Sequence, residues 1–242
     1  MRRWVLVTRP AEELADLAAV LARRGVEVVP YPVLVPRAVD DAAAWLAVRE
    51  AAAAFRWLVL TSPRAAAAVL PAAAQHGLDA LVRRLPAASV GERTAAVARS
   101  AGLNVEMVGK GSGAALAVAL ATAVAAGDWV LHPCGREHRP ELAEELGRRG
   151  VRVVAVPVYA MELATAESLP PLPDGQAVAV LLTSPRAAAA YHAARGGQPL
   201  PCPHVAMGAT TAAEAGRLGL AARALPEPNL AALEEELCRI LS

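Results

Sequence analysis

The sequence predicts an α/β protein made of two similar lobes, each built on a parallel sheet. Short runs of β-branched residues end in small or polar turns and are followed by helical periodicity, which is typical of alternating strands and helices. The chain also repeats itself, because residues 183–190 copy residues 61–68 letter for letter. Apolar residues make up 55% of the chain but aromatic residues only 3%, so the cores must consist of Ala, Val and Leu.

The repeat extends beyond this octapeptide. Residues 151–154 echo residues 26–29, and residues 207–213 loosely echo residues 90–96. The offset between the matched segments falls from 125 to 122 to 117 residues along the chain. Loss of a few loop residues from a duplicated unit produces such a drift, because loops tolerate deletion and packed elements do not.

The elements expected in the first half follow from its strand-like runs. Strands are expected at residues 5–7, 26–29, 57–60, 89–91 and 105–108. Helices are expected at residues 11–24, 41–54, 92–101 and 111–127, the last of them rich in alanine, and another helix is expected to begin at Pro63. Ser62 and Pro63 form a strong helix start, with a capping serine before a proline at the first helical position. The prolines of residues 30–36 forbid a helix and permit an extended connector.

The second half follows the same plan. Strands are expected at residues 129–131, 151–156 and 178–182. Residues 157–161 match the first proline-bearing connector, and residues 169–175 have the composition of a loop. The Ser184-Pro185 pair repeats the helix-start signal.

Charge and cysteine content exclude several classes of protein. The net charge of +1 lacks the basic excess of a general nucleic-acid binder. The three cysteines have no disulfide or zinc-ribbon spacing, which fits a reducing cytoplasm. The apolar run after Arg3 is too short for a signal peptide, and no stretch has the ~20 apolar residues of a membrane span. Only Lys110 among the 24 basic residues is a lysine, so the chain is rich in the planar guanidinium groups that suit carboxylates.

Polar side chains gather where the predicted strands end. In α/β sheets this edge binds ligands, because helix N-termini direct free N–H groups towards it. The residues expected there are Thr61, Ser62, Arg64, Thr94, Thr183, Ser184, Arg186, Thr210 and Thr211. Helix capping alone would also explain the two serines, and solvation the two arginines.

Other motifs resemble a dinucleotide site, a P-loop or a zinc site, but each lacks a residue that such a site requires. Residues 109–114 match a loosened dinucleotide fingerprint around Lys110, but Asp128 stands at the wrong end of the following strand to hold a ribose. A P-loop requires Ser or Thr after the lysine, and Gly111 stands there. Residues 132–138 hold two histidines and a thiol without a fourth zinc ligand, so a strand-to-helix turn explains them more simply. No nucleophile elbow or paired-carboxylate arrangement is present, which predicts chemistry that needs little side-chain acid or base.

Tyr159 breaks the symmetry of the repeat. It stands where the first connector has Leu34, while Tyr31 has Val156 as its counterpart. A polar aromatic residue here is either packed in a core or a hydrogen-bond donor facing a ligand. The spacing leaves both alternatives open.

Taken together, the ordered motifs resemble the uroporphyrinogen-III synthase family over nearly the whole chain. The motifs are residues 5–10, residues 60–65, Val90-Gly91 with Thr94-Ala95, residues 133–135 with 139–142, residues 157–159, and Gly208 with residues 210–212. The resemblance implies two flavodoxin-like lobes with parallel sheets, joined by a two-stranded connector, with a ligand cleft between them. It implies that residues 1–35 and 162–242 form one lobe and residues 38–157 the other, with connectors near 32–39 and 157–163. The repeat by itself predicts two tandem halves instead.

The resemblance also implies an activity. It is the conversion of hydroxymethylbilane, a linear tetrapyrrole, to uroporphyrinogen III with loss of water and inversion of ring D, in the biosynthesis of haem, sirohaem or cobalamin. The implied enzyme is a hydro-lyase without a cofactor that proceeds through an azafulvene and a spiro intermediate. The expected partner is a polycarboxylate tetrapyrrole, handed over by the upstream hydroxymethylbilane synthase. We expect a cytoplasmic monomer without nucleic-acid or membrane partners.

By motif, the resemblance makes Tyr159 the residue that assists departure of the hydroxyl group, and Arg64 an electrostatic partner. The substrate-binding residues it implies are Thr8, Arg9, Thr61, Ser62, Arg64, Thr94, Ser184, Thr210 and Thr211, with no metal ligands. The alternative is a non-catalytic two-lobed module that binds a small anion or a tetrapyrrole, because it would share the helix N-termini and the absence of catalytic pairs.

Overall fold

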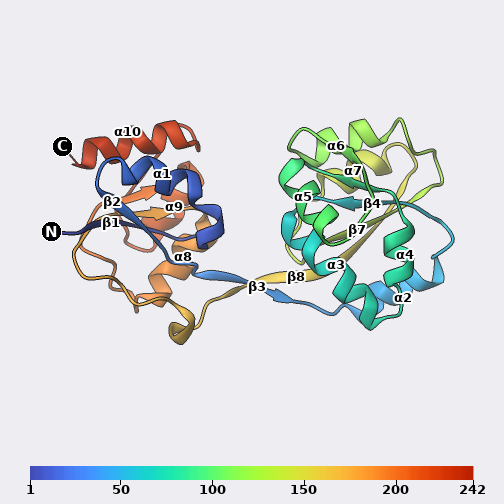
Figure 1. The fold of residues 1–242 in the computed structure, drawn as a ribbon, viewed down its shortest axis with the longest axis horizontal. Helices are drawn as coiled ribbons and strands as arrows, with labels where there is room; N and C mark the ends of the chain where they lie inside the picture. Colours follow the sequence, from blue (N-terminus) through green and yellow to red (C-terminus); the bar gives the residue numbers. More distant parts are fainter. Residues whose placement is uncertain (242) are drawn as a thin grey trace. The chain divides into compact units, whose positions relative to one another are not determined.

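The chain folds into two compact α/β units. A computed structural model describes residues 1–241. Unit 1 comprises residues 1–35 and 162–242, and unit 2 comprises residues 36–161. The chain leaves unit 1 within β3 (Leu34–Ala38) and returns to it at the end of β8 (Arg152–Leu163), as can be followed in Figure 1. These two strands pair antiparallel, since Val39 N donates to Val158 O (3.2 Å) and Ala164 N to Val33 O (3.0 Å).

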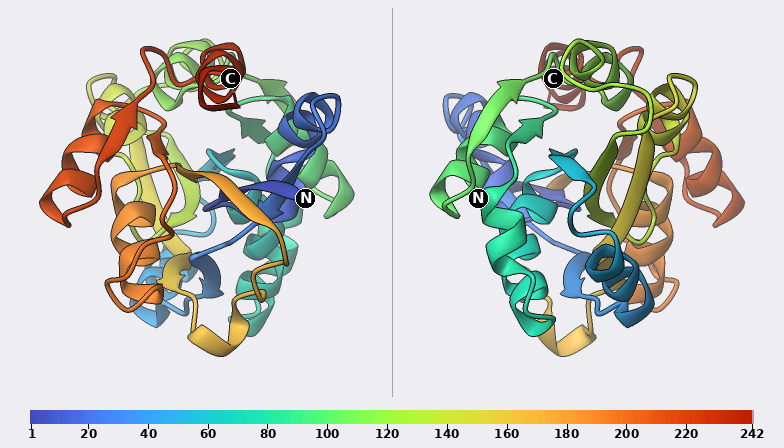
Figure 2. Two further views of the ribbon diagram at one scale, coloured as in Figure 1. Left: turned by 90° about the vertical axis from the view of Figure 1, so that its left-hand side faces the viewer. Right: turned by 90° about the vertical axis from the view of Figure 1, so that its right-hand side faces the viewer.

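Unit 1 has a five-stranded sheet in the order β11-β10-β9-β1-β2, with parallel pairing throughout. Its strands are β1 (Arg3–Val7), β2 (Val26–Pro30), β9 (Gln176–Leu182), β10 (His204–Ala206) and β11 (Ala222–Ala224). Its helices are η1 (Ala11–Glu13), α1 (Ala15–Ala22), η2 (Ala166–Ser168), α8 (Pro185–Ala194), α9 (Ala209–Arg217) and α10 (Leu230–Leu241). One buried cluster joins the sheet to α1 and α10, and another joins its opposite face to α8 and α9, a layering visible in the left-hand view of Figure 2.

Unit 2 holds the other sheet, in the order β3-β8-β7-β4-β5-β6. The other strands are β4 (Phe55–Leu60), β5 (Ala87–Ser89), β6 (Val105–Val108) and β7 (Trp129–Gly135), which pair in parallel with one another and with β8. Its helices are α2 (Ala42–Glu50), α3 (Pro63–Gln75), α4 (Asp79–Arg84), α5 (Glu92–Ser100), α6 (Gly113–Leu120) and α7 (Glu141–Gly147). Helices α2 to α5 share one apolar cluster with the sheet, and α6 and α7 share the other. The predicted α/β class with parallel sheets and a two-stranded connector is confirmed.

The two sheets have the same topology, with an exchange between the repeated halves. In unit 1 the strands, numbered in chain order, lie in the order 2-1-3-4-5, which is the flavodoxin-like arrangement. In unit 2 the strands β8, β7, β4, β5 and β6 take the positions that β2, β1, β9, β10 and β11 have in unit 1. Each sheet therefore combines the first two strands of one repeat with the last three of the other. This exchange explains why the repeat runs in tandem along the sequence while the compact units do not.

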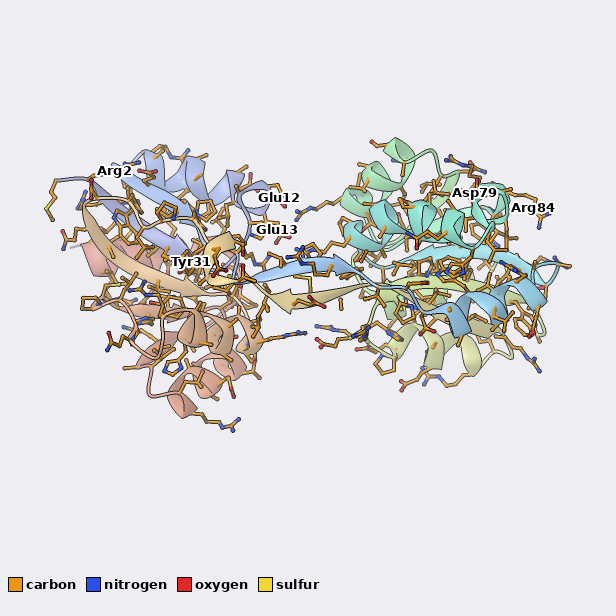
Figure 3. All side chains as sticks on the ribbon, turned by 90° about the horizontal axis from the view of Figure 1, so that it is seen from below. Arg2, Glu12, Glu13, Tyr31, Asp79 and Arg84 are labelled. Atoms are coloured by element: carbon orange, nitrogen blue, oxygen red, sulfur yellow. The ribbon has the colours of Figure 1, made fainter. Side chains whose placement is uncertain are left out.

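Side-chain caps fix where several helices begin. Asp41, Ser62, Ser112 and Ser184 each accept a hydrogen bond from the backbone N–H three residues later, at 3.0–3.1 Å. Such a cap contributes about 1 kcal/mol. Helix α4 begins at Asp79 and ends at Arg84, both labelled in Figure 3. A negative charge at the N-terminus and a positive charge at the C-terminus both interact favourably with the helix dipole.

Several expected boundaries are wrong. The strand expected at residues 89–91 ends at Ser89, and the helix expected over residues 11–24 is the short η1 followed by α1. The strand expected at residues 151–156 and the following connector are one continuous strand of 12 residues, β8. The alanine-rich helix expected over residues 111–127 covers only Gly113–Leu120. It stops because Thr122 Oγ1 donates to Ala119 O (2.9 Å), and the carboxylate of Asp128 accepts from Ala125 N (2.8 Å), which together hold a turn. Within residues 1–241, no helix has the length and apolar character needed to cross a membrane.

Candidate functional site

A pocket of about 460 Å³ lies in unit 2, at the carboxyl ends of its strands. Its wall includes Thr61 and Ser62 before α3, residues 111–114 at the start of α6, Gly135 at the end of β7, and Tyr159 on β8. The connection from β7 into α7 adds Glu137, His138, Arg139, Glu141 and Leu142. Parallel strands place all these turns at one edge of the sheet, which is where α/β folds bind ligands.

Tyr159 and Ser62 meet on the wall of this pocket. The phenol Oη of Tyr159 lies 3.2 Å from Ser62 Oγ, and Ser62 Oγ also accepts from Ala65 N (3.1 Å) as the cap of α3. Because the cap occupies one lone pair of Ser62, its own hydroxyl hydrogen is available to donate to Tyr159 Oη. In that arrangement the phenolic hydrogen of Tyr159 is left to donate to a ligand.

Thr61 has a buried partner that the sequence did not point to. Its Oγ1 lies 3.0 Å from Nε2 of His132, a residue of β7 that is only 2% exposed. Burial, with a smaller contribution from the charge of His138, lowers the pKa of His132 to about 4. His132 is therefore neutral near pH 7 and acts as a fixed hydrogen-bonding partner for Thr61.

The pocket wall carries charged side chains of both signs, Arg139 together with Glu137 and Glu141. The free N–H groups at the starts of α3 and α6 add partial positive charge, which favours carboxylates and other anions. The residues of the weak dinucleotide fingerprint, 111–114, form part of this wall, with Ser112 as the cap of α6.

The remaining unit 2 residues expected in the site lie near the pocket edge of the sheet but are not among its lining residues. Thr94 is 3% exposed in the first turn of α5, and Arg64 is half-buried in the first turn of α3. The structure thus brings Thr61, Ser62 and Tyr159 together on one wall.

In unit 1 the equivalent edge carries the other expected residues. Thr8 Oγ1 bonds Leu181 O and Thr183 Oγ1, both at 3.1 Å, so this pair joins β1 to β9. Ser184 caps α8, and Arg9 forms an ion pair with Glu13 at 3.0 Å. Thr210 is exposed in the first turn of α9, whereas Thr211 is 3% exposed.

The histidine and cysteine cluster of residues 132–138 forms no metal site. In the part of the chain that the structure describes, no three His, Cys, Asp or Glu side chains come close enough together to hold an ion. Burial raises the pKa of the Cys134 thiol to about 12, which keeps it protonated. The rings of His132 and His138 instead pack edge to face, with centroids 5.6 Å apart.

Sequence reasoning missed His132, Gly135 and the residues that follow β7. His132 lies in the middle of β7, which pairs with β4, the strand before Thr61. Its burial and its bond to Thr61 required the strand pairing itself.

The fold and the pocket define a class: two flavodoxin-like units, one carrying a ligand pocket at the helix N-termini of its sheet edge. The model of the family described as uroporphyrinogen-III synthase HemD matches residues 15–234. The chain therefore belongs to the uroporphyrinogen-III synthase family, whose members are enzymes of tetrapyrrole synthesis.

Solved structures support the same fold. A uroporphyrinogen-III synthetase from Helicobacter pylori is 17% identical and matches with a TM-score of 0.64, covering 99% of this chain and 100% of that one. A mutant uroporphyrinogen III synthase from the extremely thermophilic bacterium Thermus thermophilus is 18% identical, with a TM-score of 0.54, covering 100% of this chain and 99% of that one. No curated protein matches the sequence.

Proposed function

We propose that this protein is a hydro-lyase that converts hydroxymethylbilane to uroporphyrinogen III. The substrate loses its terminal hydroxyl as water, ring D is inverted, and the macrocycle closes. Membership of the synthase family supports this proposal. The observation that carries it is the placement of the Tyr159 phenol, 3.2 Å from Ser62 Oγ, on the wall of a pocket edged by helix N-termini.

The pocket has the groups that this chemistry requires. Tyr159 donates a hydrogen bond to the leaving hydroxyl, and Ser62 holds the phenol in that orientation. The pyrrole nitrogen supplies the electron pair that expels the hydroxyl, so a strong general acid is not needed. The N–H groups at the starts of α3 and α6 bind the acetate and propionate side chains and hold the bilane in one conformer.

The neutrality of His132 suits this role. A charged imidazolium beneath the pocket would attract a substrate carboxylate to Thr61 and change with pH, whereas a neutral ring fixes the Thr61 hydroxyl without adding charge. Thr61 then binds as a neutral hydrogen-bonding group beside Ser62.

The test is a product analysis. Purified protein is incubated with enzymatically generated hydroxymethylbilane, and the type III and type I isomers are separated after oxidation to porphyrins. We expect type III to dominate, whereas a reaction without protein gives the uninverted type I isomer. An isomer ratio equal to that of the blank would overturn the proposal, including the case in which the protein binds the bilane without converting it.

A further inference from the structure

Strand β8 has an extra residue immediately before Tyr159. Along the pair of strands, Cys134 lies opposite Pro157 and Gly135 lies opposite Tyr159, so Val158 has no partner on β7. The pairing resumes at once, because Arg136 N donates to Tyr159 O at 2.8 Å. Val158 O is instead the acceptor for Val39 N, on the other side of β8. This is a β-bulge within β8, at the point where its partner β7 ends.

The bulge changes the face on which Tyr159 lies. In a regular strand successive side chains alternate, so Val156 and Val158 would share one face and Tyr159 would lie on the other. Here Val156 and Val158 belong to the cluster beneath α3, and Tyr159 packs against that same cluster. The extra residue thus directs the phenol towards the start of α3, where Ser62 stands.

Gly135 leaves the space that the phenol occupies. A Cβ on this residue would lie 2.9 Å from Cζ and 3.0 Å from Oη of Tyr159, so the phenol ring would have to shift. Gly135 is not among the glycines with positive φ, so the backbone itself would accept alanine. The requirement for glycine is therefore one of space, and its cause is the tyrosine ring.

We propose that Gly135 is a positioning residue for Tyr159. With the bulge at Val158, it forms a slot that holds the phenolic oxygen against Ser62 and towards the pocket. This inference rests on the proposed function for its catalytic consequence, while the slot itself is a property of the fold. A methyl group at position 135 displaces the ring, and a misplaced donor costs catalysis without loss of substrate carboxylate binding.

The first arm of the test measures activity. Gly135→Ala is expected to lower kcat at least tenfold with little change in KM, because displacements of about 1 Å can cost up to ~100-fold in rate. Adding Gly135→Ala to Tyr159→Phe, which lacks the hydroxyl, is expected to produce no further drop in kcat. An equal drop in both backgrounds would overturn the proposal, since a general structural defect acts regardless of the hydroxyl.

The second arm measures thermal unfolding and does not depend on activity. Gly135→Ala is expected to lower the melting temperature in the wild-type background but not in Tyr159→Ala, where the ring is gone. The matched control is Gly147→Ala at the end of α7, where an added methyl has open space and the residue is exposed, so kcat is expected to be unchanged. A melting temperature lowered equally with and without the ring would overturn the slot.

The two arms separate the inference from the proposed function. If the wild-type protein left the isomer ratio unchanged, the proposed function would fail. The slot would still be tested, because the effect of Gly135→Ala on the melting temperature is compared with and without the Tyr159 ring. If Gly135→Ala alone proved insoluble, recovery of soluble protein in the double variant with Tyr159→Ala would support the slot, and continued insolubility would overturn it.

Discussion

The same octapeptide begins α3 in unit 2 and α8 in unit 1, and it folds in the same way in both. Ser62 and Ser184 have extended backbones and cap their helices with hydrogen bonds of 3.1 Å. The preceding threonines then differ in their partners: Thr61 bonds the buried His132 of β7, and Thr183 bonds Thr8, which follows β1. The local sequence determines the turn and its helix cap, whereas the neighbouring strand determines the hydrogen-bond partner of the threonine.

A second difference lies in the next strand of each sheet, which pairs with β7 in unit 2 and with β1 in unit 1. In unit 2 this strand is β8, and its bulge brings Tyr159 to Ser62. In unit 1 the corresponding strand is β2, which pairs with β1 in one uninterrupted register. Tyr31, labelled in Figure 3, follows β2 and is 5% exposed, packed edge-on against Tyr191 with ring centroids 6.5 Å apart. One tyrosine is thus part of a pocket wall and the other is part of a core.

The largest expected effect tests this contrast between the tyrosines. Tyr159→Phe is expected to lower turnover about tenfold or more, because it removes one oriented donor to the leaving hydroxyl and leaves the ring in place. Tyr31→Phe is the matched control and is expected to retain turnover close to the wild-type rate. Steady-state rates of porphyrinogen formation measure both. An unchanged rate in Tyr159→Phe would remove this residue from the mechanism.

The next effect concerns His132, which joins Thr61 to β7. Its pKa is lowered to about 4 in the folded state, while the unfolded chain binds a proton near the ordinary value of 6.5. Stability is therefore fully present above about pH 6.5 and falls as the pH drops from 6.5 to 4. Between about pH 7.5 and pH 5 the loss is about 2 kcal/mol.

Tryptophan fluorescence during urea unfolding can assign this loss to unit 2. Trp4 lies in unit 1 and Trp45, Trp57 and Trp129 lie in unit 2, so Trp4→Phe leaves a signal from unit 2 alone. In this background His132→Gln is expected to flatten the pH dependence. Burial also lowers the pKa of His204, but this residue lies in unit 1, which gives no tryptophan signal in the Trp4→Phe background. An unaltered slope in His132→Gln would show that another group carries the acid sensitivity.

How much of this could be read from the sequence depends on the range of the interaction. The caps at Ser62 and Ser184 are local and follow from Ser-Pro before an alanine-rich helix. The tandem repeat was visible, but the exchange of strands between its copies is a question of pairing, on which the periodicity of a strand gives no information. For the same reason the pairs Thr61–His132 and Ser62–Tyr159 could not be derived, because each joins residues far apart in the sequence.

Replacing the threonines tests the difference between their partners. Thr61→Val leaves a buried histidine without its hydrogen bond, which is expected to cost about 1–3 kcal/mol of unfolding free energy. Thr183→Val is expected to cost about 0.5–1 kcal/mol, because Thr8 Oγ1 keeps its bond to Leu181 O. Urea unfolding of the two variants measures this difference. Equal losses would mean that the histidine gains nothing from its bond to Thr61.

The smallest effects compare the two capping serines. Ser62→Ala and Ser184→Ala each remove one N-cap and are expected to lower the free energy of unfolding by about 1 kcal/mol. Ser62→Ala also removes the hydrogen bond to the Tyr159 phenol, so its kcat is expected to fall severalfold, whereas kcat of Ser184→Ala stays close to the wild-type value.

Threonine variants at the same two positions separate capping from orientation. Ser62→Thr keeps the cap, since threonine is also an N-cap residue, and is expected to restore stability. Its hydroxyl also keeps the bond to Tyr159, so kcat is expected to recover together with stability. If kcat of Ser62→Ala and Ser184→Ala fell by the same factor, the two serines would act only as caps. The contact between Ser62 and Tyr159 would then have no part in orienting the phenol.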